Sequence, residues 1–309
     1  MNVLLSRYAT YATHGLVACA VAGYLSAQGP FIHKIKETFQ MYKDGYPVKM
    51  DQDILGRCQD VLRKARIAKA SKPDIQFFLM SGDEPFTFGS VNNGFHSGIV
   101  GLPWNFTYKS IKDIDPTELR AIDGQPIKWD STTGQKLIDS LVLSPKAQNF
   151  VIMREIYMLD NYKLYTIPLM MALNTIFARS LIQNINTKER FWKMSLVTRV
   201  YGKCLVISLF LLSFLATRDI SHCYHQSKAD IMAVGHGNDY YDGAVEYYGK
   251  VLQRNKAFSK MLGDDGPNYF TEDGDEKFSF LKFIMRCRQL PITKRLNAIN
   301  DHMTAHFDD

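Results

Sequence analysis

Three long apolar runs interrupt the alternation of polar and hydrophobic residues along the chain. They lie at 11–32, 164–182 and 204–217, and basic residues rather than acids flank the second and third. A helix needs roughly 20 apolar residues to cross a bilayer core, and lysine or arginine at its ends can reach the headgroups. The pattern therefore predicts an amino-terminal membrane helix and a transmembrane hairpin. A buried hairpin of a soluble protein stays open as an alternative, because Pro168 and Asn174 dilute the second run.

These runs divide the chain into membrane segments and two soluble parts. The segments are an anchor at 1–34, a first soluble part at 35–162, the hairpin at 163–217 and a second soluble part at 218–309. The hairpin loop is basic, with Lys188, Arg190, Lys193 and Arg199 against Glu189. Basic loops tend to stay on the side of synthesis, which would leave both soluble parts across the membrane. Because a hairpin returns the chain to the side it left, these parts can build one composite domain.

Shorter patterns predict an α+β fold for the composite domain, mostly helical with a small antiparallel sheet. Apolar stretches rich in β-formers and separated by turn residues predict three strands, at 75–81, 85–91 and 98–102. Apolar residues at helical spacing predict three helices, at 52–72, 221–234 and 240–262. A glycine-containing break at 235–238 separates the last two of these helices.

Composition excludes several classes of protein. The chain has 309 residues, of which 46% are hydrophobic, so it is long and apolar enough for a true core. Its net charge of +6 is mild and dispersed, which disfavours nucleic-acid binding. The five cysteines form no Cys-x-x-Cys pair, and no disulfide framework is expected. No acid precedes Glu37 and Arg7 lies near the start, so a mitochondrial leader and an uncleaved anchor are both open.

A helix of the first soluble part carries a sequence that resembles a metallopeptidase motif. Ser144 and Pro145 provide an N-cap and a proline at the first helical position. Residues 154–158 then stand where membrane-embedded zinc metallopeptidases keep His-Glu-x-x-His, a motif of two imidazoles one turn apart with a glutamate as general base. Arg154 and Met158 occupy the places of both imidazoles, and only Glu155 is retained.

The order of the parts resembles the same peptidases: sheet, motif helix, membrane hairpin, then a helix with Glu-x-x-Ala-Asp. Gln226 stands at the place of the third zinc ligand, and Asp230 ends the motif. The resemblance implies a degenerate frame with no zinc ligands, no protease activity and no cofactor. In such a frame the two motif helices are neighbours, so we expect Arg154 to pair with an acid such as Asp230.

The densest cluster of potential metal ligands follows the third apolar run. His222, Cys223 and His225 lie there, and the two histidines are three residues apart, so they can share a helix face. A complete copper or zinc site would need further ligands. Packing at the membrane interface is the alternative interpretation of this cluster.

A second resemblance covers most of the chain in the same order. The stretches that carry it are Gly-Ile-Val-Gly-Leu-Pro at 98–103, Leu-Ser-Pro-Lys-Ala-Gln-Asn-Phe through Arg-Glu-Ile-Tyr at 143–157, Gly-Ala-Val-Glu-Tyr-Tyr at 243–248 and Leu-Pro at 290–291. In these the chain resembles the transmembrane protein 177 family. The resemblance implies a multi-pass protein of the mitochondrial inner membrane that assists cytochrome c oxidase assembly, at the maturation of subunit 2 and its copper site.

These observations lead to one expected function and two alternatives. We expect a non-catalytic assembly or stability factor that contacts the lipid bilayer and binds a membrane-protein client. The resemblance implies that this client is subunit 2 of cytochrome c oxidase with its assembly scaffold. The alternatives are a membrane enzyme of the zinc metallopeptidase type and a copper-handling protein that uses His222, Cys223 and His225.

Overall fold

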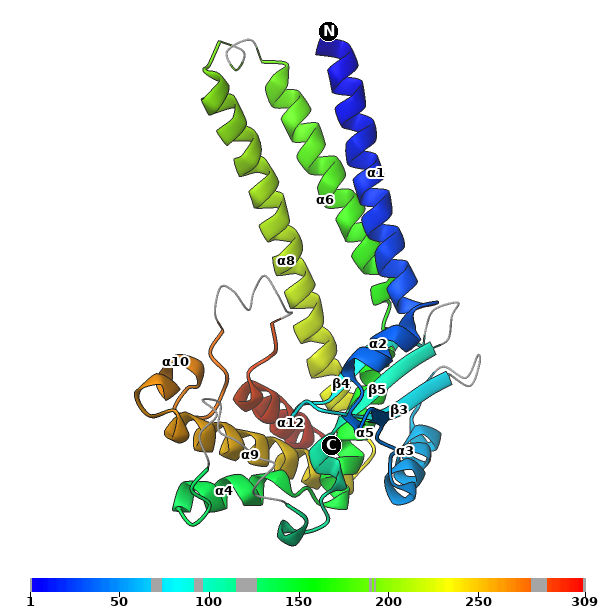
Figure 1. The fold of residues 1–309 in the computed structure, drawn as a ribbon, viewed down its shortest axis with the longest axis vertical. Coiled ribbons are helices and arrows are strands. Elements are labelled where there is room, and N and C mark those ends of the chain that lie inside the picture. The colour runs from blue at the N-terminus through cyan, green and yellow to red at the C-terminus, as the bar shows by residue number, and fades with distance from the viewer. Residues whose placement is uncertain are drawn as a thin grey trace.

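Three long helices project from one end of the molecule, and the remaining elements gather at the other end (Figure 1). The computed structural model describes residues 2–67, 74–91, 97–114, 127–188, 191, 193–278 and 288–307. The projecting helices are α1 (Asn2–Gln28), α6 (Lys163–Asn186) and α8 (Leu196–Val234). The amino terminus, the end of α6 and the start of α8 lie at their far end, and the carboxyl terminus lies in the domain. The hairpin thus returns the chain to the domain, as the apolar runs predict.

Two of the projecting helices, α6 and α8, are long and apolar enough to cross a membrane. Helix α1 meets that description only together with α2 (Ile32–Phe39), from which it is bent by 68°. Within the described residues the chain therefore has two candidate spans, or three if the bent pair is one span. Helix α1 packs on α6, where Arg179 Nη1 lies 3.0 Å from His14 Nε2.

Helix α8 is longer than the sequence predicts. The separate helix expected at 221–234 is continuous with the third apolar run, in one helix of 39 residues. No glycine or proline occurs between Lys203 and Val234 to end it. The same helix therefore extends from the membrane segment into the domain.

The main sheet is mixed rather than antiparallel. Its strands are β3 (Asp74–Met80), β4 (Phe86–Ser90) and β5 (Ser97–Pro103), in the order β3-β5-β4. Strand β5 is antiparallel to β4 and parallel to β3, so the purely antiparallel prediction is wrong. Turn residues between successive strands mark a change of direction, but they do not show which strands become neighbours. The described residues of β5 are buried from Gly98 to Pro103, as expected for a central strand.

Several boundaries in the domain differ from the predicted ones. Helix α3 (Gln52–Lys64) ends before the predicted 72, because Ala65 is extended; residues 68–72 lie outside the described part. The Asp44-Gly45 turn joins β1 (Tyr42–Lys43) to β2 (Tyr46–Pro47), with φ of 53° and 81°. The other elements are α4 (Thr132–Leu141), α5 (Pro145–Leu159), α9 (Asn238–Met261), α10 (Gly266–Tyr269), α12 (Ile292–Phe307) and the 3₁₀ turns Trp104–Thr107, Ile111–Asp113 and Gly263–Asp265.

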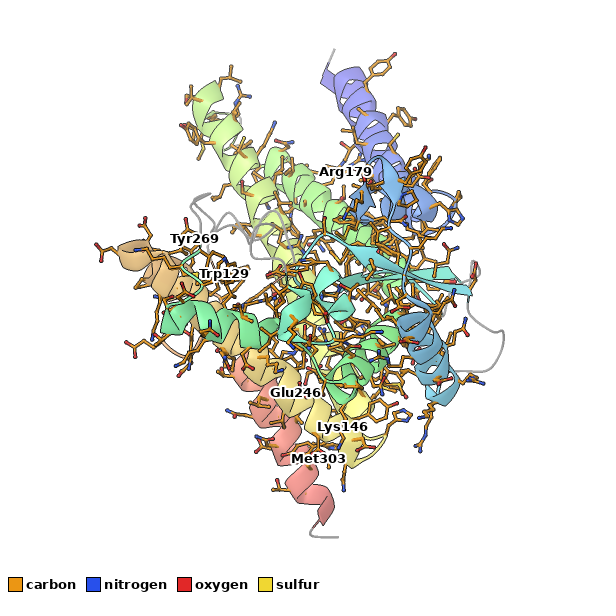
Figure 2. The ribbon with its side chains drawn as sticks, turned by 60° about the horizontal axis from the view of Figure 1, so that its bottom comes forward. Trp129, Lys146, Arg179, Glu246, Tyr269 and Met303 are labelled. Atoms are coloured by element: carbon orange, nitrogen blue, oxygen red, sulfur yellow. The ribbon has the colours of Figure 1, made fainter. Side chains whose placement is uncertain are left out.

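Helix α5 lies at the centre of the core and packs on α3, α8, α9, β4 and β5. Its start is as predicted: Ser144 Oγ accepts from Ala147 N at 3.2 Å, and Pro145 is the first residue. Close packing on α9 needs a glycine, since a Cβ on Gly243 would lie 2.3 Å from the Lys146 carbonyl oxygen. Figure 2 shows Lys146 and Glu246 near the start of this contact, where Glu246 Oε1 accepts from Ser144 N at 2.9 Å. Elements from both sides of the hairpin therefore share one core.

Candidate functional site

Four buried charged side chains form a continuous series at the centre of the domain. Arg154 of α5 donates through Nη1 to Glu155, and its Nε lies 3.2 Å from Asp230 Oδ1 of α8. Arg295 of α12 donates to both oxygens of Asp230, each at 2.7 Å. We call the series Glu155, Arg154, Asp230 and Arg295 the ion chain. The predicted pairing of Arg154 with Asp230 is confirmed.

Positive and negative charges alternate along the ion chain, and this alternation offsets the desolvation cost of burying them. The exposed fractions are 6% for Arg154, 2% for Glu155, 1% for Asp230 and 4% for Arg295. Burial by itself would lower the pKa of Arg154, but the carboxylates of Glu155 and Asp230 raise it above the usual value. Burial and the neighbouring Arg154 likewise oppose the charge of Arg295, and Asp230 raises its pKa. Both guanidinium groups therefore stay charged, and each acid is needed to offset the desolvation of its partner.

Neutral side chains from two further elements complete the ion chain. Tyr248 of α9 donates to Asp230 Oδ1 at 2.7 Å, and the Arg295 guanidinium carbon lies 4.7 Å from the centre of its ring. Thr87 of β4 donates to Glu155. Burial raises the pKa of Tyr248 well above its ordinary value, so the hydroxyl keeps its proton and remains a donor. The sequence analysis did not assign roles to Tyr248 and Arg295. The available signal for Arg295 is that a basic residue stands among apolar residues at helical spacing.

The remaining positions of the metallopeptidase-like frame lie beside the ion chain. Gln226 is buried on α8, and its Oε1 accepts from Leu290 N at 2.9 Å. Met158 is buried in the apolar core on α5. The structure thus brings together the helices that the frame assigns to the motif.

The donor set does not fit a zinc ion. The three ligand places hold a guanidinium, a thioether and an amide, in Arg154, Met158 and Gln226, whereas zinc is bound by thiolate, imidazole or carboxylate. The positive charge of Arg154 also repels a cation, and Glu155 is engaged with Arg154 and Thr87. Within the described ranges no group of three or more His, Cys, Asp or Glu is arranged to hold a metal.

His222, Cys223 and His225 make three separate contacts. His222 Nδ1 lies 3.3 Å from Lys163 Nζ, and Cys223 Sγ donates to the Arg288 carbonyl at 3.4 Å. The ring of His225 lies edge-on to Tyr224. His222 and Cys223 therefore contribute to the contacts between α8 and its neighbours, whereas the His225 ring contacts a residue of its own helix. Cys287, a further potential ligand, lies outside the described residues.

A cavity of about 590 Å³ separates the ion chain from the base of the projecting helices. We call it the junction cavity. Arg154 and Arg295 line it on the domain side, and Tyr24 of α1, Met171 of α6 and Phe214 of α8 line it on the membrane side. Its membrane end is therefore mainly apolar, whereas its domain end combines the two guanidinium groups with apolar side chains such as Phe86 and Val251.

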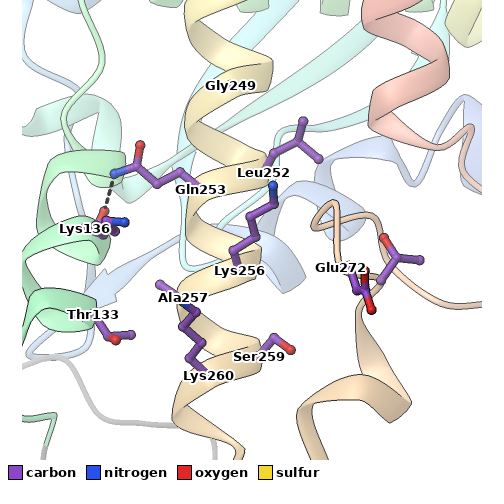
Figure 3. Close-up of a pocket in the computed structure, with 11 residues that line it drawn as sticks. Thr133, Lys136, Gly249, Leu252, Gln253, Lys256, Ala257, Ser259, Lys260 and Glu272 are labelled. Atoms are coloured by element: carbon purple, nitrogen blue, oxygen red, sulfur yellow. Dashed lines mark hydrogen bonds between the residues drawn. The ribbon is translucent and has the colours of Figure 1, made fainter.

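A second cavity of about 690 Å³ lies between α4 and α9. Figure 3 shows Lys136 of α4 and Lys256 and Lys260 of α9 around it, with Glu272 on the facing loop. These four charged side chains are exposed. Water can hydrate them, so this groove carries no buried charge comparable to the ion chain.

Comparison with known proteins identifies relatives along nearly the whole chain. The sequence profile of the family described as Transmembrane protein 177 matches residues 15–305. Proteins named Transmembrane protein 177 are 26% identical in Danio rerio, 24% in Xenopus laevis and 25% in Homo sapiens. These alignments cover 86%, 93% and 84% of this chain and 84%, 90% and 81% of the relatives. No solved structure matches the fold.

Proposed function

The chain belongs to the transmembrane protein 177 family, and from that premise we propose that it is a non-catalytic assembly and stability factor of the mitochondrial inner membrane. Its proposed client is subunit 2 of cytochrome c oxidase, bound together with the scaffold and copper-delivery partners of that subunit. The resemblance to this family supports the choice of client and compartment. Apolar helices and family membership both agree with a protein embedded in a membrane.

The ion chain is the observation that carries the non-catalytic part of the proposal. A hydrolase of the metallopeptidase type needs a metal-bound water beside its glutamate. Here the guanidinium of Arg154 contacts Glu155, and its Nε lies 3.2 Å from Asp230. A permanent cation in ion pairs with both acids holds α5 against α8, and it provides neither a Lewis acid nor a nucleophile.

Helix α8 supports a role in holding a client within the membrane. It begins at Leu196 in the hairpin and runs without a break to Val234, past Asp230. Its apolar residues Leu205, Leu209 and Leu211 are exposed along the membrane segment. A client helix packed there would contact an element that is anchored at its other end in the ion chain.

The proposal is tested in cells that lack this protein, by measuring the half-life of newly made subunit 2 in mitochondria. We expect the half-life to shorten severalfold and to recover with the wild-type chain. Recovery should also follow with Glu155→Gln when the two proteins are compared at equal steady-state levels, because the substitution removes an acid of the ion chain as well as the carboxylate that a peptidase requires. An unchanged half-life in the cells that lack the protein would refute the client, and failure of a stably expressed Glu155→Gln variant would refute the non-catalytic role.

A triple substitution of His222, Cys223 and His225 with alanine distinguishes the copper-handling alternative from our proposal. Under our proposal this variant still co-purifies with subunit 2 at the wild-type ratio. Loss of bound copper together with loss of subunit 2 would instead favour the copper alternative.

A further inference from the structure

The junction cavity contains hydrogen-bond donors that no protein acceptor uses. Arg154 donates to Glu155 through Nη1, and its Nε lies 3.2 Å from Asp230 Oδ1 without making a hydrogen bond. Arg295 donates to Asp230 through Nε and Nη2. Among the described residues, the remaining guanidinium nitrogens have no acceptor, and neither do the Gln226 amide nitrogen and the Tyr247 hydroxyl. All four side chains line the cavity and are more than nine-tenths buried.

Arg154 Nε is buried without a hydrogen-bond partner, and the other donors belong to side chains that line the cavity, so this arrangement indicates a ligand rich in acceptor oxygens. The nearby carboxylates do not meet the need, because Glu155 is bonded to Arg154 and Thr87 while Asp230 is bonded to Arg295 and Tyr248. Burial raises the pKa of Tyr247 to about 12, which keeps its hydroxyl protonated and able to donate. Guanidinium groups in particular match the oxygens of phosphate.

The opposite end of the cavity is made by the projecting helices. Ile167 and Met171 of α6 and Phe214 of α8 supply apolar side chains, and Lys163 and Arg218 stand between them and the domain. This order, apolar toward the membrane and cationic toward the domain, matches the boundary between acyl chains and headgroups. The ligand should therefore be amphipathic and enter from the bilayer.

We propose that the junction cavity binds the phosphate headgroup of a membrane phospholipid, with its acyl chains beside Met171 and Phe214. The charge of the lining favours a phosphodiester over free phosphate. Four basic and two acidic side chains line the cavity, and Asp219 and Asp230 offset two of the basic groups from outside the lining. An almost neutral site accepts one negative charge more easily than the two that inorganic phosphate carries. This inference stands independently of the client proposed above.

The full chain, purified in mild detergent and washed extensively, is analysed for phospholipid by phosphorus content and mass spectrometry. We expect about one phospholipid per chain in a single-site cavity. Thermal unfolding is then followed while phosphatidylglycerol, diacylglycerol with the same acyl chains, or inorganic phosphate is added to delipidated protein. Ligand that binds only the folded state raises the unfolding temperature, and we expect this from phosphatidylglycerol alone.

Two variants locate the site without breaking the ion chain. Tyr247→Phe removes one donor and should weaken phosphatidylglycerol binding about tenfold, while Tyr240→Phe on the same helix, whose hydroxyl does not line the cavity, should not. Met171→Trp fills the apolar end and should reduce retained lipid. Equal stabilisation by diacylglycerol, stabilisation by inorganic phosphate alone, or wild-type lipid retention in both cavity variants would each overturn the proposal.

Discussion

Helices α5 and α6 follow one another with only residues 160–162 between them, yet α5 buries charged side chains and α6 exposes large apolar ones. Helix α5 buries a charged pair, Arg154 and Glu155. Helix α6 leaves its large apolar residues outside, and Phe177 is 58% exposed. The protein supplies the surroundings of α5 through ion partners on α8 and hydrogen bonds from β4, whereas a bilayer must supply the surroundings of α6. One chain is thus adapted to two solvents within 42 residues, since α5 starts at Pro145 and α6 ends at Asn186.

The two helices should therefore fail in different ways. Removing a partner from the ion chain leaves a charge stranded in the domain, which destabilises the fold but leaves membrane insertion unaffected. Adding a charge to α6 opposes insertion and leaves the contacts of the domain unchanged. Each substitution below tests one side of this comparison.

Asp230→Ala should have the largest effect. It removes the acid between Arg154 and Arg295, and a broken buried ion pair costs about 3–5 kcal/mol. Thermal unfolding of the purified chain in detergent should show a large drop in the unfolding temperature, with unchanged membrane integration. Asp242→Ala is the matched control, because its partner Lys146 lies at the surface and such pairs contribute little. A wild-type unfolding temperature for Asp230→Ala would contradict the claim that the buried charges of α5 depend on their ion partners.

Phe177→Asp should impair membrane insertion of the hairpin. A carboxylate near the centre of a spanning helix costs about 3 kcal/mol on insertion scales. The measurement is the fraction of protein that resists alkaline carbonate extraction, with Phe177→Leu as the control. Full integration of Phe177→Asp would show that α6 faces protein or water at this position and not lipid.

Tyr248→Phe should have a smaller effect than loss of a charge. The hydroxyl donates to Asp230, and a hydrogen bond to a charged group contributes about 2 kcal/mol. Arg295 still holds both oxygens of Asp230, so the ion chain stays intact. The unfolding temperature should fall by less than in Asp230→Ala. An equal fall in the two variants would mean that the charges themselves contribute little.

The contribution of Tyr247 to stability at alkaline pH should be the smallest change that we expect to measure. Burial raises the pKa of Tyr247 to about 12 from an ordinary value of 10.0. Above pH 10 the unfolded chain loses this proton before the folded chain does, so stability falls as pH rises from 10 to 12 and is unaffected below 10. At pH 11 the contribution of Tyr247 to this loss is about 1 kcal/mol. Tyr247→Phe should lose less stability by that amount, while Tyr248, whose pKa is also raised, still contributes in both proteins. Parallel pH profiles of the two proteins would contradict this assignment.

Features that depend on local sequence could be predicted. The apolar runs mark α6 and α8, and Ser144 with Pro145 marks the start of α5, because hydrophobicity and capping act within a few residues. The pairing of Arg154 with Asp230 is a long-range contact, and it was predictable only through the order of motifs along the chain.

Features that depend on tertiary contacts could not be predicted. Strand β5 lies between β3 and β4 because its buried residues fit the centre of the sheet, a choice that the turns do not encode. Arg295 follows the Leu-Pro stretch at 290–291 that belongs to the family resemblance, but its two bonds to Asp230 require α12 to return beside α8. The junction cavity is likewise lined by residues of α1, β4, α5, α6, α8, α9 and α12, so no single segment of the sequence predicts it.

The metal content of the purified full-length chain tests the central claim most directly, because the Arg154 guanidinium and a zinc ion are both cations and cannot both lie beside Glu155. Zinc is measured by plasma mass spectrometry alongside hydrolysis of unfolded protein substrates, in the wild type and in Glu155→Gln. We predict far less than one zinc per chain and no hydrolysis in either protein. One zinc per wild-type chain, with hydrolysis that disappears in Glu155→Gln, would contradict the account.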